Sequence, residues 1–442
     1  MENLVNKIIS LCKRRGFVFP SSEIYGGFES CYDYGPLGVE LKNNIKQVWW
    51  QSMVQENENI VGLDASILMN PKVWQASGHL SAGFADQLVE CQGCHKRFKV
   101  EDVKDKCSDC GGNLSQPKQF NLMMKTLIGS VEDQATTTYL RAETCQGIYV
   151  NFLNVLQSAR LKIPFGIAQI GKSFRNEVTT KNFIFRTREF EQMEMQFFVN
   201  SKEANKWFDF WLEKRLSWYQ KLGLDNKKIR AYEVSEKDRA HYAKRQVDIE
   251  YHFPWGWQEI EGVHNRGDWD LSRHAQHSKQ DLSYFDSENK EKFIPWIIET
   301  SAGVDRLLLT FLFDAYQEIK GGRTVTTKST KEEETFLKIH QNLAPIKIAV
   351  LPLSKKEEIT KPSRDIYNQL KKYWLVEYDE TSSIGRRYRR QDEIGTPFCL
   401  TVDFDSLTDK KVTIRDRDLM IQERIKIDNL KNYFRDKFEV EL

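Results

Sequence analysis

The residues best suited to chemistry lie in one stretch, 166–198, which reads GIAQIGKSFRNEVTTKNFIFRTREFEQMEMQFF. It predicts two β-strands around a short polar loop, and alternate side chains of a strand share a face. One surface would then gather Arg175, Glu177, Arg186, Arg188, Phe190 and Glu194. Arginines clamp phosphate oxygens and an aromatic ring stacks on a base, so this surface indicates a nucleoside triphosphate site. The alternative is a solvated amphipathic hairpin.

A second pattern is formed by four of the eight cysteines. Cys91-x-x-Cys94 and Cys107-x-x-Cys110 have the spacing of a zinc ribbon, in which each pair gives two thiolates to one tetrahedral ion. Four thiolates leave no open coordination position, so we expect structural Zn²⁺ in an insertion at about residues 88–115. The alternative is a cluster of reduced thiols without metal.

The chain as a whole has the composition of a globular protein with two or three domains: 442 residues, 40% hydrophobic and 29% charged. A net charge of +2 excludes nucleic-acid binding through a general basic field, so RNA contacts must come from local patches. No apolar run approaches the roughly 18 residues of a membrane helix, and the N-terminus lacks the residue order of a signal peptide. We therefore expect a cytoplasmic protein that contacts no membrane.

Other elements must position the predicted nucleotide site. Residues 36–55 have apolar positions at helical spacing, residues 60–69 read as a strand, and residues 201–222 read as a helix. A strand, a glycine turn and a helix are predicted over 296–313. That turn, at Gly303, places Arg306 near a helix N-terminus, where an arginine suits a phosphate.

Residues 255–271 are predicted to form a strand and a turn. Strict alternation would point the carboxylates of Glu259 and Glu261 to the same side, with Arg266 just past the turn. His274 and His277 have the spacing of a metal-binding pair, but no third ligand is nearby, so we interpret both as surface or loop histidines.

Residues 340–442 read as a separate domain, and the polar stretch 318–335 is the nearest to a linker. Strands at 346–353, 375–380, 398–404 and 412–415 alternate with helices around 362–374 and at the end of the chain, which indicates an α/β layer. Charge runs are usually solvated faces. Arginines interleaved with Tyr388 nevertheless favour RNA-backbone binding, and these are Arg386, Arg387, Arg389, Arg390 and Arg415.

These patterns together resemble the class II aminoacyl-tRNA synthetases. The family's motif 2 is Phe-Arg-x-Glu, a loop, then Arg-x-x-x-Phe-x-x-x-Glu, to which Phe174-Arg175-Asn176-Glu177, Arg186, Phe190 and Glu194 are similar. The helix and strand of 36–69 resemble motif 1, and the turn from Gly303 to Arg306 resembles motif 3. Three motifs in order are more specific than any one alone.

Two segments narrow the resemblance to the bacterial homodimeric glycyl-tRNA synthetases. Residues 32–38 read Tyr-Asp-Tyr-Gly-Pro-Leu-Gly. Residues 141–147 match the family's Arg-Pro-Glu-Thr-Ala-Gln-Gly except at Ala142 and Cys145. Neither departure changes a polar residue, and we interpret Cys145 as a small buried hydrophobe.

The resemblance implies an α+β fold: a class II antiparallel sheet flanked by helices, the zinc-ribbon insertion, and a C-terminal α/β anticodon-binding domain. The catalytic domain would span residues 1–335 and the anticodon-binding domain residues 340–442. The implied reaction joins glycine to ATP as glycyl-adenylate and then transfers glycine to the 3′ end of tRNA(Gly). A homodimer is implied, with Mg²⁺ on the ATP phosphates.

The resemblance also implies the site residues. Those for ATP are Arg175, Glu177, Arg186, Phe190 and Arg306, of which Arg175 and Arg306 act in catalysis. Those for glycine are Glu143, Glu194, Arg266, Glu299 and Ser301. The five arginines of the C-terminal domain would contact the anticodon region.

Two other interpretations stay open. The first is a catalytically inactive, synthetase-like RNA-binding protein, although such a protein would be expected to lose phosphate-binding arginines that are all present here. The second is a synthetase for another amino acid, against which the 141–147 segment and Glu299-Thr300-Ser301 argue.

Overall fold

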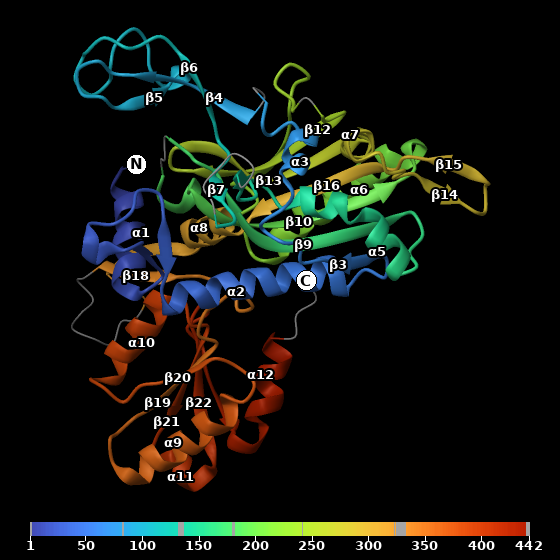
Figure 1. Ribbon diagram of the computed structural model, residues 1–442. Coiled ribbons are helices and arrows are strands. Elements are labelled where there is room, and N and C mark those ends of the chain that lie inside the picture. The colour runs from blue at the N-terminus through green and yellow to red at the C-terminus, as the bar shows by residue number, and fades with distance from the viewer. Residues whose placement is uncertain are drawn as a thin grey trace.

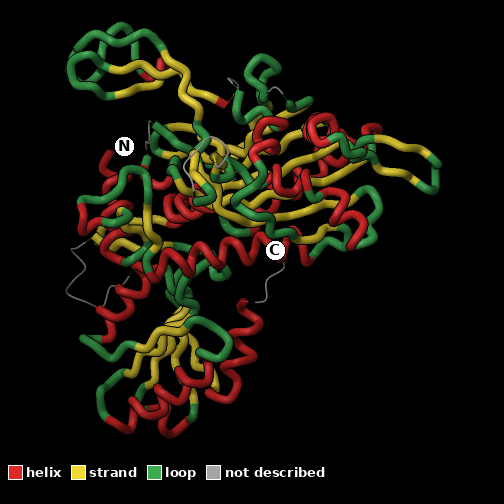
Figure 2. Tube along the Cα trace, in the orientation of Figure 1, coloured by secondary structure: helices red, strands yellow, loops and turns green. Residues whose placement is uncertain are grey.

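The computed structural model describes residues 2–81, 84–130, 137–178, 182–240, 242–321, 323 and 333–438. Figure 1 shows a large body around one sheet, a narrow ribbon that projects from it, and a smaller body in orange and red at the C-terminal end. Figure 2 shows strands gathered at the centre of both bodies with helices around them. No helix within the described ranges is long and apolar enough to cross a membrane.

The centre of the large body is a seven-stranded sheet with the order β11-β12-β13-β16-β10-β9-β3. Its strands pair antiparallel except for the edge strand β3, which pairs parallel with β9, so the predicted antiparallel sheet is confirmed with one parallel edge. The bounds are β3 Ile60–Gly62, β9 Phe165–Phe174, β10 Glu189–Val199, β11 Ile229–Glu233, β12 Arg245–Phe253, β13 Gly256–Gly267 and β16 Trp296–Gly303.

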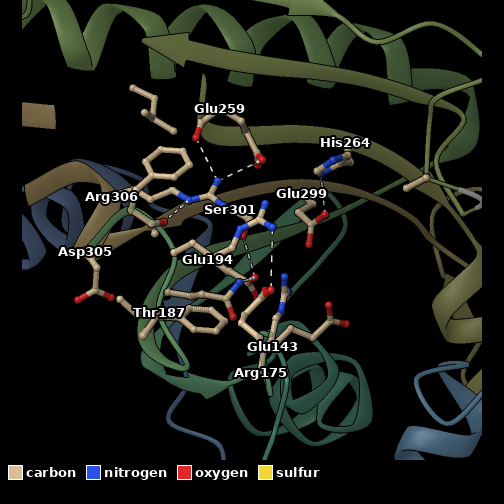
Figure 3. A pocket seen from close by; sticks show the side chains of 18 of the residues that line it. Glu143, Arg175, Thr187, Glu194, Glu259, His264, Glu299, Ser301, Asp305 and Arg306 are labelled. Carbon is tan, nitrogen blue, oxygen red and sulfur yellow. Dashed lines mark hydrogen bonds and ion pairs between the residues drawn. The ribbon is translucent and has the colours of Figure 1, made fainter. Parts of the chain in front are cut away.

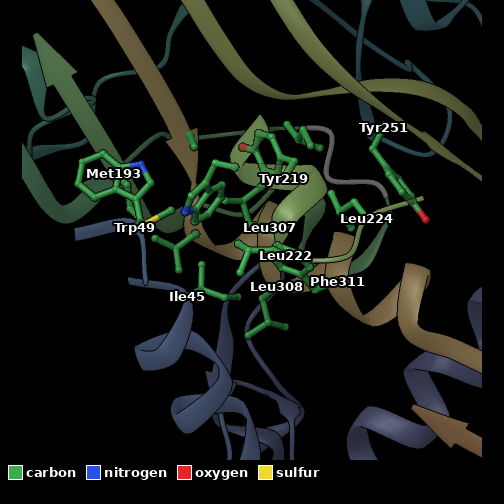
Figure 4. Close-up of a cluster of buried hydrophobic side chains, with 14 of the residues drawn as sticks. Ile45, Trp49, Met193, Tyr219, Leu222, Leu224, Tyr251, Leu307, Leu308 and Phe311 are labelled. Atoms are coloured by element: carbon green, nitrogen blue, oxygen red, sulfur yellow. The ribbon is translucent and has the colours of Figure 1, made fainter. Parts of the chain in front are cut away.

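Long helices cover one face of this sheet and bury its apolar side chains. They are α2 (Pro36–Trp50), α6 (Ala204–Lys221) and α8 (Val304–Ala315), in agreement with the predicted helices. Figure 4 shows the cluster they form, in which Ile45 and Trp49 of α2 and Leu307 of α8 pack near Met193 of the sheet. On the opposite face the short helix α4 (Cys145–Val150) contacts β9 and β10, and the polar side chains of Gln192 and Glu194 line a cavity.

The predicted strand over 60–69 is wrong beyond Gly62. The backbone of the following residues bonds to the sheet edge and to buried side chains: Leu63 N–H donates to Ala168 O, and Ala65 N–H donates to Gln169 Oε1. The chain then turns into a short helix, α3 (Pro71–Ala76).

A β-bulge on β13 overturns the expected alternation of Glu259 and Glu261. Ile249 pairs with Glu261 while its neighbour Glu250 pairs with Glu259, so Ile260 is an extra residue. The bulge sends the two carboxylates to opposite faces: Glu261 bonds Arg215 and Tyr219 of α6 in the core, and Glu259 bonds Arg306 in the cavity described below.

The ribbon contains β4 (Ala85–Glu90), β5 (Arg97–Lys99) and β6 (Lys118–Asn121), which form a three-stranded sheet.

The remaining elements of the large body are α1 Glu2–Arg15, β1 Val18–Pro20, β2 Tyr32–Tyr34, β7 Lys125–Leu127, β8 Thr137–Tyr139, α4 Cys145–Val150, α5 Phe152–Ser158, α7 Trp269–Ser278, β14 Tyr284–Asp286 and β15 Glu291–Phe293.

The smaller body has a five-stranded mixed sheet, ordered β20-β19-β21-β22-β23, and a hydrophobic cluster of its own. Its elements are β19 Ile348–Pro352, α9 Glu357–Leu370, β20 Val376–Tyr378, α10 Ile384–Ile394, β21 Phe398–Val402, α11 Asp405–Asp409, β22 Lys411–Asp416, β23 Gln422–Lys426 and α12 Leu430–Phe438. The α/β pattern expected here is therefore present, with a helix that begins and ends earlier than 362–374. Residues 322 and 324–332 of the predicted linker lie outside the described residues, and the flanking strands β17 (Tyr316–Lys320) and β18 (Glu333–Leu337) pair.

Candidate active site

A cavity of about 300 Å³ opens over the polar face of the central sheet. Its walls are the β9–β10 hairpin, β13, β16 and the first turn of α8 (Figure 3). Along β10 the odd-numbered Met193 and Phe197 face the hydrophobic core, whereas Gln192 and Glu194 line the cavity. The period of two in this strand therefore separates core from site.

All five residues implied for ATP line this cavity. The guanidinium of Arg175 lies 5.4 Å from the centroid of the Phe190 ring, and its Nε donates to the Ala142 carbonyl at 3.1 Å. The half-exposed Arg186 lies 3.9 Å from the carboxylate of Glu177. One cation thus lies over a ring, and a second lies near a carboxylate, in the same cavity.

Arg306 reaches the same end from the first turn of α8. Its Nη1 donates to the backbone carbonyl and to Oε2 of Glu259, at 3.0 and 3.2 Å, and its Nε donates to the carbonyl of Phe185 at 3.3 Å. A guanidinium carries five N–H donors, so these bonds can orient Arg306 while other donors contact a ligand. The predicted strand and helix are present, and β16 runs directly into α8 at Gly303 without a separate turn.

Asp305 fixes the position of that helical turn. Its Oδ2 accepts the backbone N–H of Glu191 on β10 at 2.7 Å, and its Oδ1 accepts from Lys42 Nζ at 2.9 Å and from the Tyr34 hydroxyl. The first turn of α8 is thereby tied to the hairpin and to α2.

Arg188 was predicted to share the surface of Arg175 and Arg186, but it lies outside the cavity. Its Nε donates to the Glu177 carbonyl at 3.0 Å and its Nη1 to the Glu29 carbonyl at 3.2 Å. Strand β10 begins only at Glu189, so alternation does not extend back to Arg188. Its contacts tie the hairpin to the N-terminal segment.

The residues implied for glycine lie at the other end of the cavity, and all five line it. Glu194 accepts from Thr144 Oγ1 at 2.6 Å, from Ser301 Oγ at 2.8 Å and from Gln192 Nε2 at 2.9 Å. Glu299 accepts from Gln196 Nε2 at 2.9 Å and from Arg266 Nη1 at 3.0 Å. The expected position of Arg266 past a turn is wrong, because β13 continues through Gly267.

The three carboxyl groups at this end differ in charge. Burial, together with the charges of Glu299 and Glu143, raises the pKa of Glu194 to about 8. Burial also disfavours the charged form of Glu299, but Arg266 and His264 outweigh it and lower the pKa to about 2. For Glu143, burial is outweighed by His79 and Arg266, and the pKa lies well below its usual range. At neutral pH the cavity thus holds two ionised carboxylates, Glu143 and Glu299, and one carboxyl, Glu194, that would ionise beside a cation.

The four predicted zinc ligands lie together in the ribbon. Their sulfur atoms are all within 4.8 Å of one another, with Sγ–Sγ distances of 3.4 Å for Cys91–Cys110 and 3.7 Å for Cys94–Cys107. A tetrahedral ion with Zn–S bonds of about 2.3 Å separates its sulfurs by roughly 3.8 Å. Backbone N–H groups of Gly93 and Cys94 point at Cys91 Sγ, at 3.3 and 3.4 Å, as a thiolate requires. The cysteines therefore fit one zinc ion.

The five arginines of the C-terminal domain lie in different surroundings. Arg387 is buried and donates to the carbonyls of Pro352 and Asp379, and Arg415 is buried in a bidentate pair with Asp392 at 2.8 and 2.9 Å. Arg390 pairs with Asp379. Arg386 is exposed and Arg389 is half-buried on the same helix, α10.

Comparison with known proteins identifies the chain's family. Residues 129–314 match the family described as tRNA synthetase class II core domain (G, H, P, S and T), and residues 347–437 match the one described as anticodon binding domain. The glycine–tRNA ligase of Treponema denticola is 54% identical over 95% of this chain and 94% of its own. Those of Borreliella burgdorferi and Thermobifida fusca are 52% and 50% identical, each over at least 96% of both chains. The chain belongs to the glycine–tRNA ligases.

The fold extends beyond this family. A prolyl-tRNA synthetase from Cryptosporidium parvum, solved with halofuginone and AMPPNP, superposes with a TM-score of 0.66 over 98% of this chain and 75% of its own, at 16% identity. That likeness confirms the class II fold.

The sequence analysis did not identify His264, which lines the cavity. His264 lies on β13 two residues before Arg266, and its Nδ1 is 2.8 Å from Glu299 Oε2. The spacing of two along a strand was the signal that could have found it.

The interpretation of His274 as a surface residue is wrong: it is buried on α7, and its Nε2 lies 2.8 Å from Gln146 Oε1. His277 is exposed, as expected.

Proposed function

We propose that this cavity is where the glycine–tRNA ligase reaction of the chain takes place, with ATP at the arginine end and glycine at the carboxylate end. The observation that carries the proposal is the meeting of Arg175, Arg186 and Arg306 with Glu143, Glu194 and Glu299 in one cavity. An ATP phosphate chain needs the first group, and a small amino acid needs the second for its ammonium.

In the first step an oxygen of the glycine carboxylate attacks the α-phosphorus of ATP, and the bond to pyrophosphate breaks. Arg175 would hold the α-phosphate and stabilise its growing negative charge. Phe190 and Arg306 would enclose the adenine, whose amino group would bond Glu177, while Arg186 and Arg306 would hold the γ-phosphate end. No protein nucleophile takes part, so positioning and charge supply the catalysis.

In the second step a hydroxyl of the 3′-terminal ribose of the tRNA attacks the glycyl carbonyl, and AMP leaves with the electron pair of the broken bond.

Mg²⁺ on the phosphates of ATP would neutralise their charge and needs few protein carboxylates. Glu259 fits this need, because its carboxylate lines the arginine end of the cavity.

Selection of glycine follows from size. Every competing amino acid carries a side chain on its α-carbon, so a cavity that closes on that carbon rejects all of them by overlap. Glu143, Glu194 and Glu299 would surround the ammonium, Ser301 would fill the wall beside it, and Arg266 would support Glu299 from the side. Three carboxyl groups both attract the cation and occupy the space a side chain would need.

We further propose that Cys91, Cys94, Cys107 and Cys110 hold one structural Zn²⁺, because their sulfur geometry fits a tetrahedral ion. The eight cysteines all lie within the described residues and none is in a disulfide, which is consistent with a reducing compartment such as the cytoplasm.

We propose residues 1–335 as the catalytic domain and 340–442 as the anticodon-binding domain, because the smaller body has its own hydrophobic cluster. Within it, we propose that Arg386 and Arg389 on α10 contact the anticodon region of tRNA(Gly), because Arg386 is exposed and Arg389 is half-buried. Arg387 and Arg415 are buried and support the surface from within, through Pro352, Asp379 and Asp392, and the partly exposed Arg390 pairs with Asp379.

We also propose a homodimer. Large apolar side chains are exposed in the N-terminal part of the single chain: Ile24 at 89% and Tyr25 at 86%, ahead of α2, and Val39 at 40% on α2. A second copy of the chain would remove them from water.

The experiment that tests the proposal is amino-acid-dependent ATP–pyrophosphate exchange with glycine, alanine and serine, each measured on the wild type and on Glu299→Ala. We expect exchange with glycine alone in the wild type, and in the variant a weaker glycine affinity or new activity with alanine. Glu288→Ala, a change on the exposed β14–β15 hairpin, is the matched control. Unchanged kinetics of Glu299→Ala with both amino acids would contradict the assigned glycine site.

A further inference from the structure

Helix α7 (Trp269–Ser278) lies beside the carboxylate end of the cavity without lining it. Two polar residues four apart on this helix, Asp270 and His274, are buried at 1% and 6% exposure. Residues four apart share one face of a helix, and here that face meets the buried ends of Arg266 and Gln146. Buried polar groups are retained only with partners, so these contacts explain both residues.

Asp270 determines the direction of Arg266. Its Oδ2 accepts from Arg266 Nε at 2.7 Å and its Oδ1 from Nη2 at 2.9 Å, a bidentate arrangement that fixes the guanidinium plane. The remaining arm, Nη1, then donates to Glu299 Oε2 at 3.0 Å. Asp270 therefore acts on Glu299 through one arginine.

His274 determines the direction of Gln146. The amide nitrogen of Gln146 donates to Glu143 Oε1 at 2.9 Å and lies 3.4 Å from Asp270 Oδ1, and both partners are carboxylates, which here accept hydrogen bonds. The amide oxygen must therefore face His274, 2.8 Å away, and accept from a protonated Nε2. Burial lowers the pKa of His274 to about 4, so the neutral ring with its proton on Nε2 makes this bond at neutral pH.

We infer that Asp270 and His274 are positioning residues for the substrate ammonium: α7 orients Glu299 through Arg266 and Glu143 through Gln146. The inference rests on the proposed glycine site. It adds that the selectivity of the cavity for glycine depends on a helix that never touches the substrate. Glu143 Oε1 accepts from Gln146 and from Cys145 Sγ at 3.0 Å, which leaves Oε2 to face the ligand.

The helix is held firmly enough for this task. Leu271 packs in the buried cluster of Phe152, Phe165 and Phe198, and Arg273 Nε donates to the Ala76 carbonyl at 3.2 Å. Helix α7 is therefore held against both α4 and α3. A change at His274 would act on Gln146, and a change at Asp270 would act mainly on Arg266 and also on Gln146.

The test is steady-state ATP–pyrophosphate exchange in which the KM for glycine and the KM for ATP are measured separately. His274→Leu removes the donor at similar volume, and we expect about a tenfold rise in the glycine KM with the ATP KM unchanged. His274→Gln keeps an N–H near the position of Nε2 and should restore most of the loss. Asp270→Asn should raise the glycine KM in the same selective way. His277→Leu, on the exposed side of the same helix, is the matched control.

A merely structural role would raise both KM values or lower the melting temperature, and the conservative His274→Gln would not rescue it. A wild-type glycine KM in folded His274→Leu and Asp270→Asn would overturn the inference, as would an equal rise in both KM values. Glu143→Gln separates the two claims. If it too leaves the glycine KM unchanged, the proposed glycine site fails; if it raises that KM while the α7 variants do not, only the role of α7 fails.

Discussion

Raising the pH from about 6 to about 8 should strengthen glycine binding through the single carboxyl of Glu194. In the free protein, burial and the nearby charges of Glu299 and Glu143 raise the pKa of Glu194 to about 8. An ammonium bound beside this group favours its ionised form. Glycine should therefore bind with release of a proton wherever Glu194 is still protonated.

The magnitude follows from the pKa. With a value of about 8, roughly one molecule in a hundred has an ionised Glu194 at pH 6 and about one in two at pH 8. If only the ionised form binds the ammonium, the apparent affinity rises about 50-fold over this interval. Stability changes in the opposite sense. The folded chain keeps a proton that an unfolded glutamate releases near pH 4.5, so this stabilisation is complete below that pH and is lost as the pH passes about 8.

The assay is the glycine KM in pyrophosphate exchange across this pH range at saturating ATP, with the ATP KM as control. Calorimetric titration with glycine at pH 7, in two buffers of different ionisation heat, should count about one proton released. Glu194→Gln cannot ionise, so its glycine KM should be high and independent of pH. A wild-type glycine KM that stays constant over the range, with no proton release, would refute the reasoning.

Three further changes test other parts of the site. Arg175→Ala should lower the exchange rate by about 10²- to 10³-fold, because a donor to the developing charge is lost; calorimetric glycine binding should stay within a few fold. Cys107→Ser should lower bound zinc, measured by mass spectrometry of the metal, and the melting temperature of the ribbon, while the exchange KM for glycine is retained. Arg386→Glu should raise the KM for tRNA in aminoacylation and leave pyrophosphate exchange unchanged, because α10 lies in the other body. Full aminoacylation by Arg386→Glu, or full zinc content in Cys107→Ser, would contradict the corresponding assignment.

The sequence alone was sufficient wherever a residue's role follows from a strand's period of two. Glu194 and Gln192 share a face of β10 that Met193 does not, and this pattern is visible in the printed residues. It failed where the backbone departs from regularity. The extra residue at Ile260 places the Glu261 side chain on the face of the sheet opposite to the predicted one, and an isoleucine gives no indication of a bulge.

The sequence also could not predict contacts between residues that lie far apart along the chain. His274 bonds Gln146 across 128 residues, so its burial depends on how α7 docks against α4 and cannot be inferred from neighbouring residues. Arg415 is separated by 23 residues from Asp392, and this pairing takes it into the interior of the smaller body. A cluster of arginines looks the same in sequence whether its members face solvent or acidic partners.

The arrangement of charge in the cavity explains how a substrate as small as glycine can be oriented. Glycine has no side chain that a pocket could bind, so its orientation depends on the opposite charges of its ammonium and its carboxylate. At the proposed glycine site the ammonium would be drawn to the end where Glu143 and Glu299 are negatively charged, and its arrival would make Glu194 a third anion. The same anions would repel the carboxylate, which would then face Arg175, where the α-phosphate of ATP would lie. A reversed glycine would place like charges together at both ends, a penalty of several kcal/mol in a poorly hydrated site. With these residues the proposed site would select the reactive orientation by electrostatics and the amino acid by size.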